Sequence, residues 1–194
     1  SLAVRTNGDL IAGGAFLHAG GGFAYRIASW NGASWSAFAT GMDDVVRTVC
    51  ALPGGLVFAG GDFGYADRVH VKRVGLWNGS HWSTLEPVAP WPSVPGTVRT
   101  MLRLSNGDLI VGGDFPLTGA GSCVARWSNS AWQPMAFGIP ATVRALVDVP
   151  NLGIVAGGNA GVSLWNGTSW QSLGGSVGAV FCMLVLPNGT LTVG

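Results

Sequence analysis

The sequence contains little charge, and this shortage limits the partners it can attract. Asp, Glu, Lys and Arg together make up 10% of its 194 residues, whereas an average soluble domain contains about 25%. The formal net charge is only +1, so no long-range field draws the chain toward nucleic acid or an acidic membrane surface. We therefore expect no nucleic-acid partner.

Long hydrophobic runs are missing too, although 48% of the residues are hydrophobic. A membrane-spanning helix needs about 20 consecutive apolar residues, and Gly, Pro, Asn or Ser interrupts every apolar run well before that length. The nearest candidate, AVFCMLVL at 179–186, leads into a turn. The sequence therefore predicts no membrane insertion and no signal peptide. The composition is typical of an extracellular or cell-surface protein, because Lys and Glu are few while Gly, Ser, Thr, Asn and Trp are abundant.

The cysteine and histidine content predicts neither a metal centre nor an active site. The cysteines have no C-x-x-C spacing, so we expect buried free thiols: Cys50, Cys123 and Cys182. The histidines show no metal-ligand spacing: His18, His70 and His81. No H-E-x-x-H, G-x-S-x-G or nucleotide-binding loop is present. Asp43–Asp44 could bind calcium together with loop carbonyls, but our prediction is no catalytic residue, no cofactor and no metal.

Glycine and tryptophan are abundant, and both recur with a long period. A glycine doublet returns at intervals of 47, 52 and 45 residues, at Gly13–Gly14, Gly60–Gly61, Gly112–Gly113 and Gly157–Gly158. A pair of tryptophans five positions apart follows each doublet, at Trp30/Trp35, Trp77/Trp82, Trp127/Trp132 and Trp165/Trp170. A repeat of 40 to 50 residues is the length of one β-propeller blade.

Each repeat reads as four short antiparallel strands. In VRTMLRLSNGDLIVGGDF (98–115), two apolar runs flank Asn106–Gly107, which predicts a hairpin with a type I′ turn. The segment CVARWSNSAWQPM (123–135) predicts a second hairpin, in which Trp127 and Trp132 face each other across the ladder. We expect the paired indoles to fill the space between successive sheets; an aromatic platform for carbohydrate is the alternative. No segment shows sustained helical periodicity.

The fold predicted from these units is an all-β propeller of four-stranded antiparallel blades. We place the blades at approximately 1–40, 45–86, 97–138 and 142–174, with a partial fifth at 178–194, in a single domain over 1–194. A β-solenoid is the rival, although its coils are usually shorter and lack two tight hairpins per repeat.

The units, of the form NGDLIxGGxF…IAxWNGxxWxxL, resemble the kelch-like or galactose-oxidase-like propeller repeats of secreted bacterial proteins. Gly112–Gly113 and Trp127, for example, match the kelch pattern, whereas its usual tyrosine is mostly missing because the chain has only Tyr25 and Tyr65. The resemblance implies a propeller fold and a general binding role. Because 2–14 and 180–194 both align with the first two strands of a unit, we expect the natural protein to continue to six or seven blades.

Because successive strands run in opposite directions, the two tight turns of each unit lie on one face of the predicted propeller. The variable connections lie on the opposite face. Those connections are 17–26, 64–73 and 116–122 within blades, and 39–44 and 86–96 between them. The variable face is our candidate binding face, although simple tolerance of loop length would produce the same pattern.

Two features of the variable loops are candidate contacts for a partner. Arg68, His70, Lys72 and Arg73 alternate with valines, which predicts an extended strand with one basic side. This side could meet an acidic partner or a glycan, or act as a solvated edge against aggregation. Trp91, among four prolines, lies outside the repeat pattern and is the second candidate.

Three arginines recur at the start of the innermost strand of successive blades: Arg47, Arg99 and Arg144. They could hold an anion near the channel mouth, or pair with Asp62 and Asp114 of the GGDF segments, which we favour.

The sequence thus predicts a non-enzymatic binding or scaffolding propeller that contacts a protein or glycan through its variable-loop face. Two alternatives remain open. The chain could be a structural subunit of a larger extracellular assembly with neighbouring subunits, its low charge reflecting covered surface. It could also be part of a propeller enzyme whose catalytic residues lie outside this chain.

Overall fold

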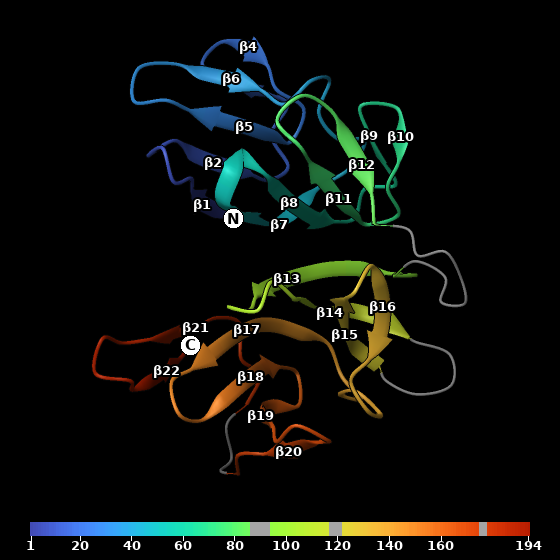
Figure 1. Ribbon diagram of the computed structural model, residues 1–194, viewed down its shortest axis with the longest axis vertical. Helices are drawn as coiled ribbons and strands as arrows, with labels where there is room; N and C mark the ends of the chain where they lie inside the picture. The colour runs from blue at the N-terminus through green and yellow to red at the C-terminus, as the bar shows by residue number, and fades with distance from the viewer. Residues whose placement is uncertain (86–93, 117–121, 175–177) are drawn as a thin grey trace. The chain divides into compact units, whose positions relative to one another are not determined.

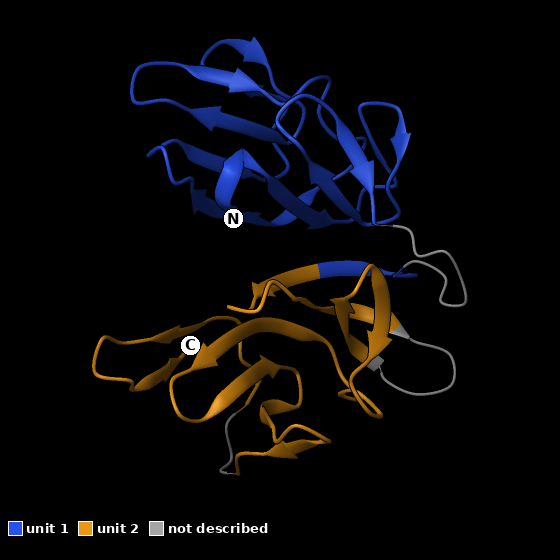
Figure 2. Cartoon of the chain, viewed as in Figure 1, with its two compact units in different colours: residues 1–88, 92–98 blue, residues 89–91, 99–194 orange. Residues whose placement is uncertain are grey.

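The computed structural model describes residues 1–85, 94–116, 122–174 and 178–194, and β-strands dominate these residues. The chain divides into two compact units, residues 1–88 with 92–98 and residues 89–91 with 99–194 (Figure 2). Within the described ranges, none of the helical segments has the length and apolar character required to cross a membrane.

The first unit contains two four-stranded antiparallel sheets in the order of the chain (Figure 1). The first sheet comprises β1 (Leu2–Val4), β2 (Leu10–Gly13), β5 (Ile27–Trp30) and β6 (Trp35–Ala37). The second comprises β7 (Val46–Ala51), β8 (Val57–Gly61), β11 (Val74–Trp77) and β12 (Trp82–Thr84). A short 3-10 turn at Pro53–Gly55 joins β7 to β8.

Two small extra hairpins lie between the second and third strands of these sheets. One pairs β3 (His18–Ala19) with β4 (Gly22–Phe23), and the other pairs β9 (Tyr65–Ala66) with β10 (Val69–His70). They occupy two of the variable connections identified in the sequence.

Two further four-stranded sheets and one hairpin follow along the chain. The third sheet comprises β13 (Thr97–Arg103), β14 (Leu109–Pro116), β15 (Ser122–Ser128) and β16 (Ala131–Pro134). The fourth comprises β17 (Val143–Val149), β18 (Gly153–Gly158), β19 (Gly161–Trp165) and β20 (Trp170–Ser172). The final hairpin pairs β21 (Met183–Val185) with β22 (Leu191–Val193). The predicted class, all-β with four-stranded antiparallel blades, is confirmed.

The N-G turn of the third sheet does not have the backbone geometry that the sequence predicts. At Asn106–Gly107 only the glycine has a positive φ, +94°, whereas a type I′ turn requires positive φ at both positions. The Asn106 Oδ1 instead accepts a hydrogen bond from the backbone N–H of Asp108 at 3.1 Å, an Asx arrangement that favours negative φ at the asparagine. In the same sheet, a turn with positive φ at both positions occurs instead at Asn129 and Ser130, with φ of 51° and 59°, where Ser128 pairs with Ala131.

The tryptophans of each pair are cross-strand neighbours, as the sequence predicts. The registers pair Trp30 with Trp35, Trp77 with Trp82, Trp127 with Trp132 and Trp165 with Trp170. The ring centroids within each pair lie 5.2 to 5.5 Å apart, within the favourable range for aromatic contacts.

In each compact unit, a side chain that follows the first full sheet packs with the tryptophan pair of the next one. Phe38, directly after β6, packs edge-on against Trp77 with ring centroids 5.4 Å apart and lies 6.0 Å from Trp82. Met135, at the matching position after β16, belongs to the same hydrophobic cluster as Trp165 and Trp170. Trp82 is 1% exposed, whereas its counterpart Trp35 in the first sheet is half-buried.

The glycine doublets have a steric role that the sequence did not reveal. A Cβ on Gly13 would lie 2.5 Å from Val46 Cγ1, and one on Gly157 would lie 2.7 Å from Val180 Cγ1. In both cases the clash is with the residue that leads the chain into the next repeat, so the first glycine permits close approach between repeats. In the second and fourth sheets a Cβ on the second glycine would strike backbone, since Gly158 would meet the Thr142 carbonyl oxygen at 1.9 Å; a Cβ on Gly14 would meet only the Phe16 side chain, at 3.1 Å.

Candidate functional site

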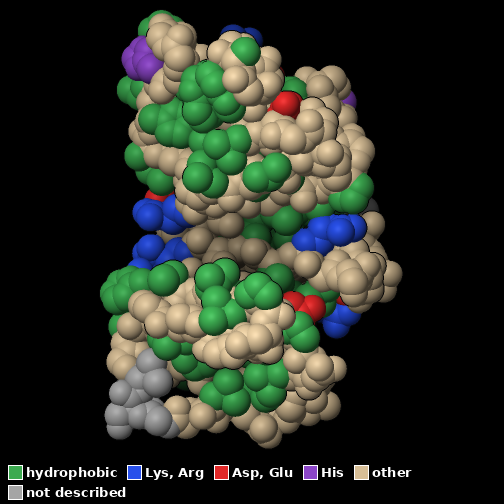
Figure 3. Space-filling view, turned by 90° about the vertical axis from the view of Figure 1, so that its left-hand side faces the viewer, with side chains coloured by type: hydrophobic (Ala, Val, Ile, Leu, Met, Phe, Trp, Pro, Cys, Tyr) green, Lys and Arg blue, Asp and Glu red, His purple; other side chains and the backbone are tan. Residues whose placement is uncertain are grey.

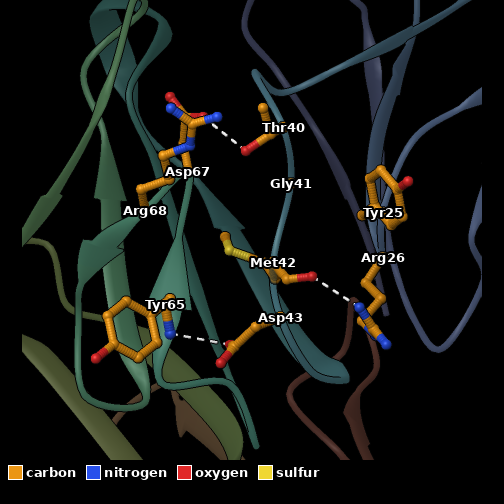
Figure 4. A pocket seen from close by; sticks show the side chains of 9 residues that line it. All are labelled: Tyr25, Arg26, Thr40, Gly41, Met42, Asp43, Tyr65, Asp67 and Arg68. Carbon is orange, nitrogen blue, oxygen red and sulfur yellow. Dashed lines mark hydrogen bonds between the residues drawn. The ribbon is translucent and has the colours of Figure 1, made fainter.

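A cavity lies in the first unit, among the variable loops of the first two sheets. It has a volume of about 610 Å³ and is lined by Tyr25, Arg26, Thr40, Gly41, Met42, Asp43, Tyr65, Asp67 and Arg68, hereafter the loop groove. Figure 4 shows the 40–43 segment between Tyr25 and Arg26 on one side and Tyr65, Asp67 and Arg68 on the other. The volume falls within the range of about 300–1,000 Å³ typical of small-molecule sites.

The second extra hairpin forms one wall of the loop groove, and Tyr25 and Arg26, which follow the first extra hairpin, form the other. Asp67 and Arg68 form the turn between β9 and β10, with φ of 45° and 67°, the type I′ geometry suited to a two-residue hairpin loop. Gly20 and Gly21 hold the matching place between β3 and β4, with φ of 59° and 85°. Each hairpin carries a cross-strand ring pair, His18 with Phe23 and Tyr65 with His70.

Hydrogen bonds tie the 40–43 segment to the residues that join the first hairpin to β5. The Met42 N–H donates to the Tyr25 carbonyl at 3.0 Å, and the Arg26 guanidinium donates to the Met42 carbonyl at 2.8 Å (Figure 4). Gly41 has a φ of +77°, and a Cβ there would lie 2.2 Å from the Tyr25 carbonyl oxygen. Only glycine fits this close approach.

Further hydrogen bonds tie the same segment to the second hairpin. Asp43 Oδ1 accepts from the backbone N–H groups of Gly64 and Tyr65, both at 2.9 Å. Thr40 Oγ1 donates to Asp67 Oδ1 at 2.6 Å, and the Asp67 N–H donates to the Gly41 carbonyl at 2.9 Å. The groove is therefore built on backbone that contacts from both sides hold in place.

Several non-glycine residues at or beside the loop groove adopt left-handed backbone conformations. Arg26 has φ 67°, Ala39 50°, Asp67 45° and Arg68 67°. Such conformations are uncommon outside glycine and asparagine, and they often concentrate at binding sites.

The predicted basic residues do not form one side of an extended strand. Arg68 lies in the hairpin turn, His70 is in β10, and Lys72 and Arg73 have φ of 46° and 78°. The expected continuous strand is wrong, because two pairs of left-handed residues bend the chain before β11 begins at Val74. Arg68 alone of the four lines the loop groove, and His70 packs its ring 4.9 Å from that of Tyr65. Trp91 lies outside the described residues.

The recurring arginines have partners in the neighbouring strand of their own sheet or directly after its end. The Arg47 Nε donates to both carboxylate oxygens of Asp62 at 2.9 Å, and Arg99 forms an ion pair with Asp114. In the fourth sheet an asparagine replaces the acid, and the Arg144 Nε donates to Asn159 Oδ1 at 3.2 Å. The guanidinium of Arg144 also lies 4.9 Å from the centre of the Phe181 ring, a cation–π contact.

Two of these arginines lie in β-bulges, which set the direction of their side chains. The register shifts between Val46 and Thr48 and between Val143 and Ala145, so Arg47 and Arg144 are the extra residues of β-bulges. A bulge re-aims its side chain and ends regular pairing. The observed pairing favours a structural role for these arginines over an anion site.

Two carboxylates of the second unit have pKa values below the ordinary Asp value of 3.8. Hydrogen bonds from Ser128, Arg126 and Asn106 outweigh burial and lower the pKa of Asp108. Burial alone would raise the pKa of Asp114, but hydrogen bonds from Arg99 and Thr142 and the charges of Arg99 and Arg144 lower it overall. Both carboxylates are thus better stabilised in the folded chain than in the unfolded one.

These shifts predict loss of stability in acid. A lowered folded-state pKa contributes stability that is fully present above the unfolded pKa and is lost as the pH falls through the folded value. We expect the urea midpoint to stay level from pH 7 to 5 and to fall below about pH 4. Asp108→Asn and Asp114→Asn should flatten this fall, whereas Asp148→Asn, at an exposed position, should not. A wild-type midpoint unchanged down to pH 2.5 would contradict the assignment.

The sequence did not indicate Tyr25, Arg26, Thr40 or Asp67 as binding groups, and it indicated Asp43 only as a possible calcium ligand. One signal was available, since the only two tyrosines of the chain both lie in the variable connections. The juxtaposition itself could not be predicted, because it depends on how the 39–44 connection crosses between the two hairpins. Among the described residues, no three His, Cys, Asp or Glu side chains gather as a possible metal site.

Comparison with solved structures shows the β-propeller fold. The WD40 β-propeller domain of Doa1 aligns with a TM-score of 0.62 and 14% sequence identity, over 86% of this chain and 53% of that chain. Two structures of the extracellular domain of BT4673 from B. thetaiotaomicron align at 9% identity over 100% of this chain, with TM-scores of 0.39 and 0.38. These alignments cover only 37% and 36% of the two BT4673 chains.

This chain thus spans about half the length of the Doa1 domain. No protein-family description matches the sequence, and no curated protein matches it either. The kelch-like relationship therefore stays a prediction, and the fold is what the comparisons establish.

Proposed function

We propose that this chain belongs to a non-enzymatic binding or scaffolding propeller, secreted or on the cell surface, which contacts a protein or glycan through its variable-loop face. The observation that carries this proposal is the loop groove, a concave site whose central 40–43 segment is held by hydrogen bonds from the β9–β10 hairpin and from the residues between β4 and β5. Binding residues are commonly placed on loops that a rigid scaffold positions.

The distribution of charge also supports a binding role over a chemical one. On the face shown in Figure 3, hydrophobic side chains greatly outnumber acidic ones. Four ionic side chains, by contrast, line the loop groove together: Arg26, Asp43, Asp67 and Arg68. Polar groups converging on a largely apolar pocket are typical of ligand recognition.

The domain boundaries form part of the same proposal. We infer one propeller with blades at approximately 1–40, 45–86, 97–138 and 142–174, and a fifth that opens with the hairpin at 178–194. The support is the repeated strand order and the repeated tryptophan register of the four full sheets.

The test compares paired substitutions on the two kinds of loop. Arg68→Ala with His70→Ala changes the variable loops, and the control, Arg103→Ala with His81→Ala, changes exposed residues of the same types elsewhere. Labelled protein is applied to a glycan array and to intact bacterial cells. We expect the first variant to lose at least fivefold in retention and the control to bind like the wild type. Equal retention of both variants, or no retention of the wild type, would reject the proposal.

An assembly role is the second candidate, and exposed apolar residues favour it. Leu2 is 67% exposed, Val4 66%, Phe181 63% and Leu184 60%. All four lie in or beside β1, an edge strand of the first sheet, and β21, the first strand of the last hairpin. Light scattering tests this candidate. A particle mass that grows with protein concentration, and that no longer grows in the double variant Leu2→Lys with Leu184→Lys, would support assembly through these residues.

A further inference from the structure

The loop groove presents hydrogen-bond acceptors that the protein itself leaves open. Asp43 and Asp67 each use Oδ1 for contacts within the chain. Among the described residues, the Oδ2 atom of each has no hydrogen-bond partner. Because the Oδ1 contacts fix both carboxylates, the open oxygens are positioned before a ligand arrives, which lowers the entropic cost of binding.

The ionic groups around the groove balance in sign. Arg26 and Arg68 contribute two positive charges and Asp43 and Asp67 two negative charges. A site with balanced charge gives little net attraction to a strongly anionic or cationic ligand. It suits a neutral ligand whose groups both donate and accept hydrogen bonds, and a hydroxyl group does both.

Two aromatic rings border the same space. Tyr25 is 39% exposed and Tyr65 is 49% exposed, so part of each ring is available to a ligand. Tyr25 stacks on Phe23 with ring centroids 5.6 Å apart, and Tyr65 packs against His70 at 4.9 Å; these contacts restrict both rings. The face of an aromatic ring carries negative potential, which attracts the weakly positive C–H groups on the apolar side of a sugar ring.

We propose that the loop groove binds a neutral saccharide unit, with Asp43 and Asp67 accepting hydrogen bonds from its hydroxyl groups and Tyr25 or Tyr65 packing against its C–H face. This inference rests on the proposed binding function and names the ligand class for that site. Arg68, at the rim, can donate to a ring or hydroxyl oxygen.

An acidic peptide is the competing ligand, and the placement of the basic residues disfavours it. Of the basic residues at 68–73, only Arg68 lines the groove. Two carboxylates in the groove would repel the acidic side chains of such a peptide.

The test uses isosteric variants that keep the internal hydrogen bonds. In Asp67→Asn the amide oxygen can still accept from Thr40, while an NH₂ group replaces the open acceptor; asparagine also tolerates the left-handed backbone found there. Asp44→Asn is the matched control, because Asp44 is an exposed neighbour that does not line the groove. Tyr65→Ala removes one ring.

The full chain is titrated with neutral saccharides: glucose, galactose, mannose, fucose, N-acetylglucosamine, lactose and cellobiose. The amide signals of Gly41, Gly64 and Tyr65 are followed by NMR. We expect at least one sugar to shift them saturably, and Asp67→Asn and Tyr65→Ala each to weaken its binding about tenfold. Asp44→Asn should leave the affinity unchanged.

A second titration with an oligoglutamate peptide separates the two proposals. If no sugar shifts these signals, or Asp67→Asn binds the sugar as tightly as the wild type, the saccharide inference is wrong. If the peptide then binds and Arg68→Ala abolishes its binding, the variable-loop face keeps its proposed function with another ligand. If neither probe binds there and the cell and array experiments are also negative, both proposals fail.

Discussion

Replacing Trp82 with alanine is expected to lower the free energy of unfolding by about 3 to 5 kcal/mol. The indole of Trp82 is 1% exposed and packs against Trp77 and Phe38, so its removal leaves a cavity where two sheets meet. Small domains are stable by only about 5 to 15 kcal/mol. The loss would therefore appear as a large decrease in the urea midpoint measured by circular dichroism.

The matched control for this prediction is Trp35→Ala. Trp35 holds the same place in the first sheet and pairs with Trp30 in the same register, but it is half-buried. Its replacement should cost clearly less, because part of the indole already contacts water. Equal losses for the two variants would show that coverage by Phe38 does not matter.

Gly61→Ala is expected to destabilise the chain by about 2 to 3 kcal/mol or more, although it adds only one methyl group. The added Cβ would lie 2.0 Å from the Val45 carbonyl oxygen and 3.1 Å from the Arg47 nitrogen. Both atoms are backbone at the bulge of β7, so they cannot move without breaking the pairing of Val46 with Gly61. Thermal unfolding would measure the loss.

Gly22→Ala provides the comparison for this substitution. The nearest atom to a Cβ on Gly22 is the Ala19 carbonyl oxygen at 3.9 Å, and its φ is not in the left-handed region. We expect its melting temperature to stay within a few degrees of the wild type. A Gly61→Ala protein that melts with the wild type would show that the close approach at the second glycine is absent.

The sequence was sufficient to predict the fold because the repeat carries the information. Paired tryptophans at a fixed spacing, apolar runs and N-G turns together predict four-stranded units, and the registers show Trp127 opposite Trp132. The type of the N-G turn was wrong, since the Asn106 side chain stabilises a conformation that composition alone does not distinguish. The steric role of Gly61 depends on the approach of another strand, so no local pattern could indicate it.

The candidate site could be predicted only in part, because loops between repeats do not follow the repeat. The sequence located the variable connections and identified Arg68, which lines the groove. It predicted a strand where Asp67 and Arg68 make a turn, because alternation of valine and basic residues resembles a strand when the left-handed positions are unknown. The sequence indicated Asp43 only as a possible calcium ligand, and its place in the groove depends on its bonds to Gly64 and Tyr65.

The central claim is that, within each compact unit, a side chain that follows one sheet packs on the cross-strand indole pair of the next sheet, as Phe38 does on Trp77 and Trp82. NMR of a chain with labelled phenylalanine and tryptophan tests this most directly, through nuclear Overhauser effects from the Phe38 ring. We predict strong cross-peaks from Phe38 to the indole of Trp77, whose ring centroid lies 5.4 Å away, and weaker ones to Trp82. Absence of both sets of cross-peaks in the folded chain would contradict the account.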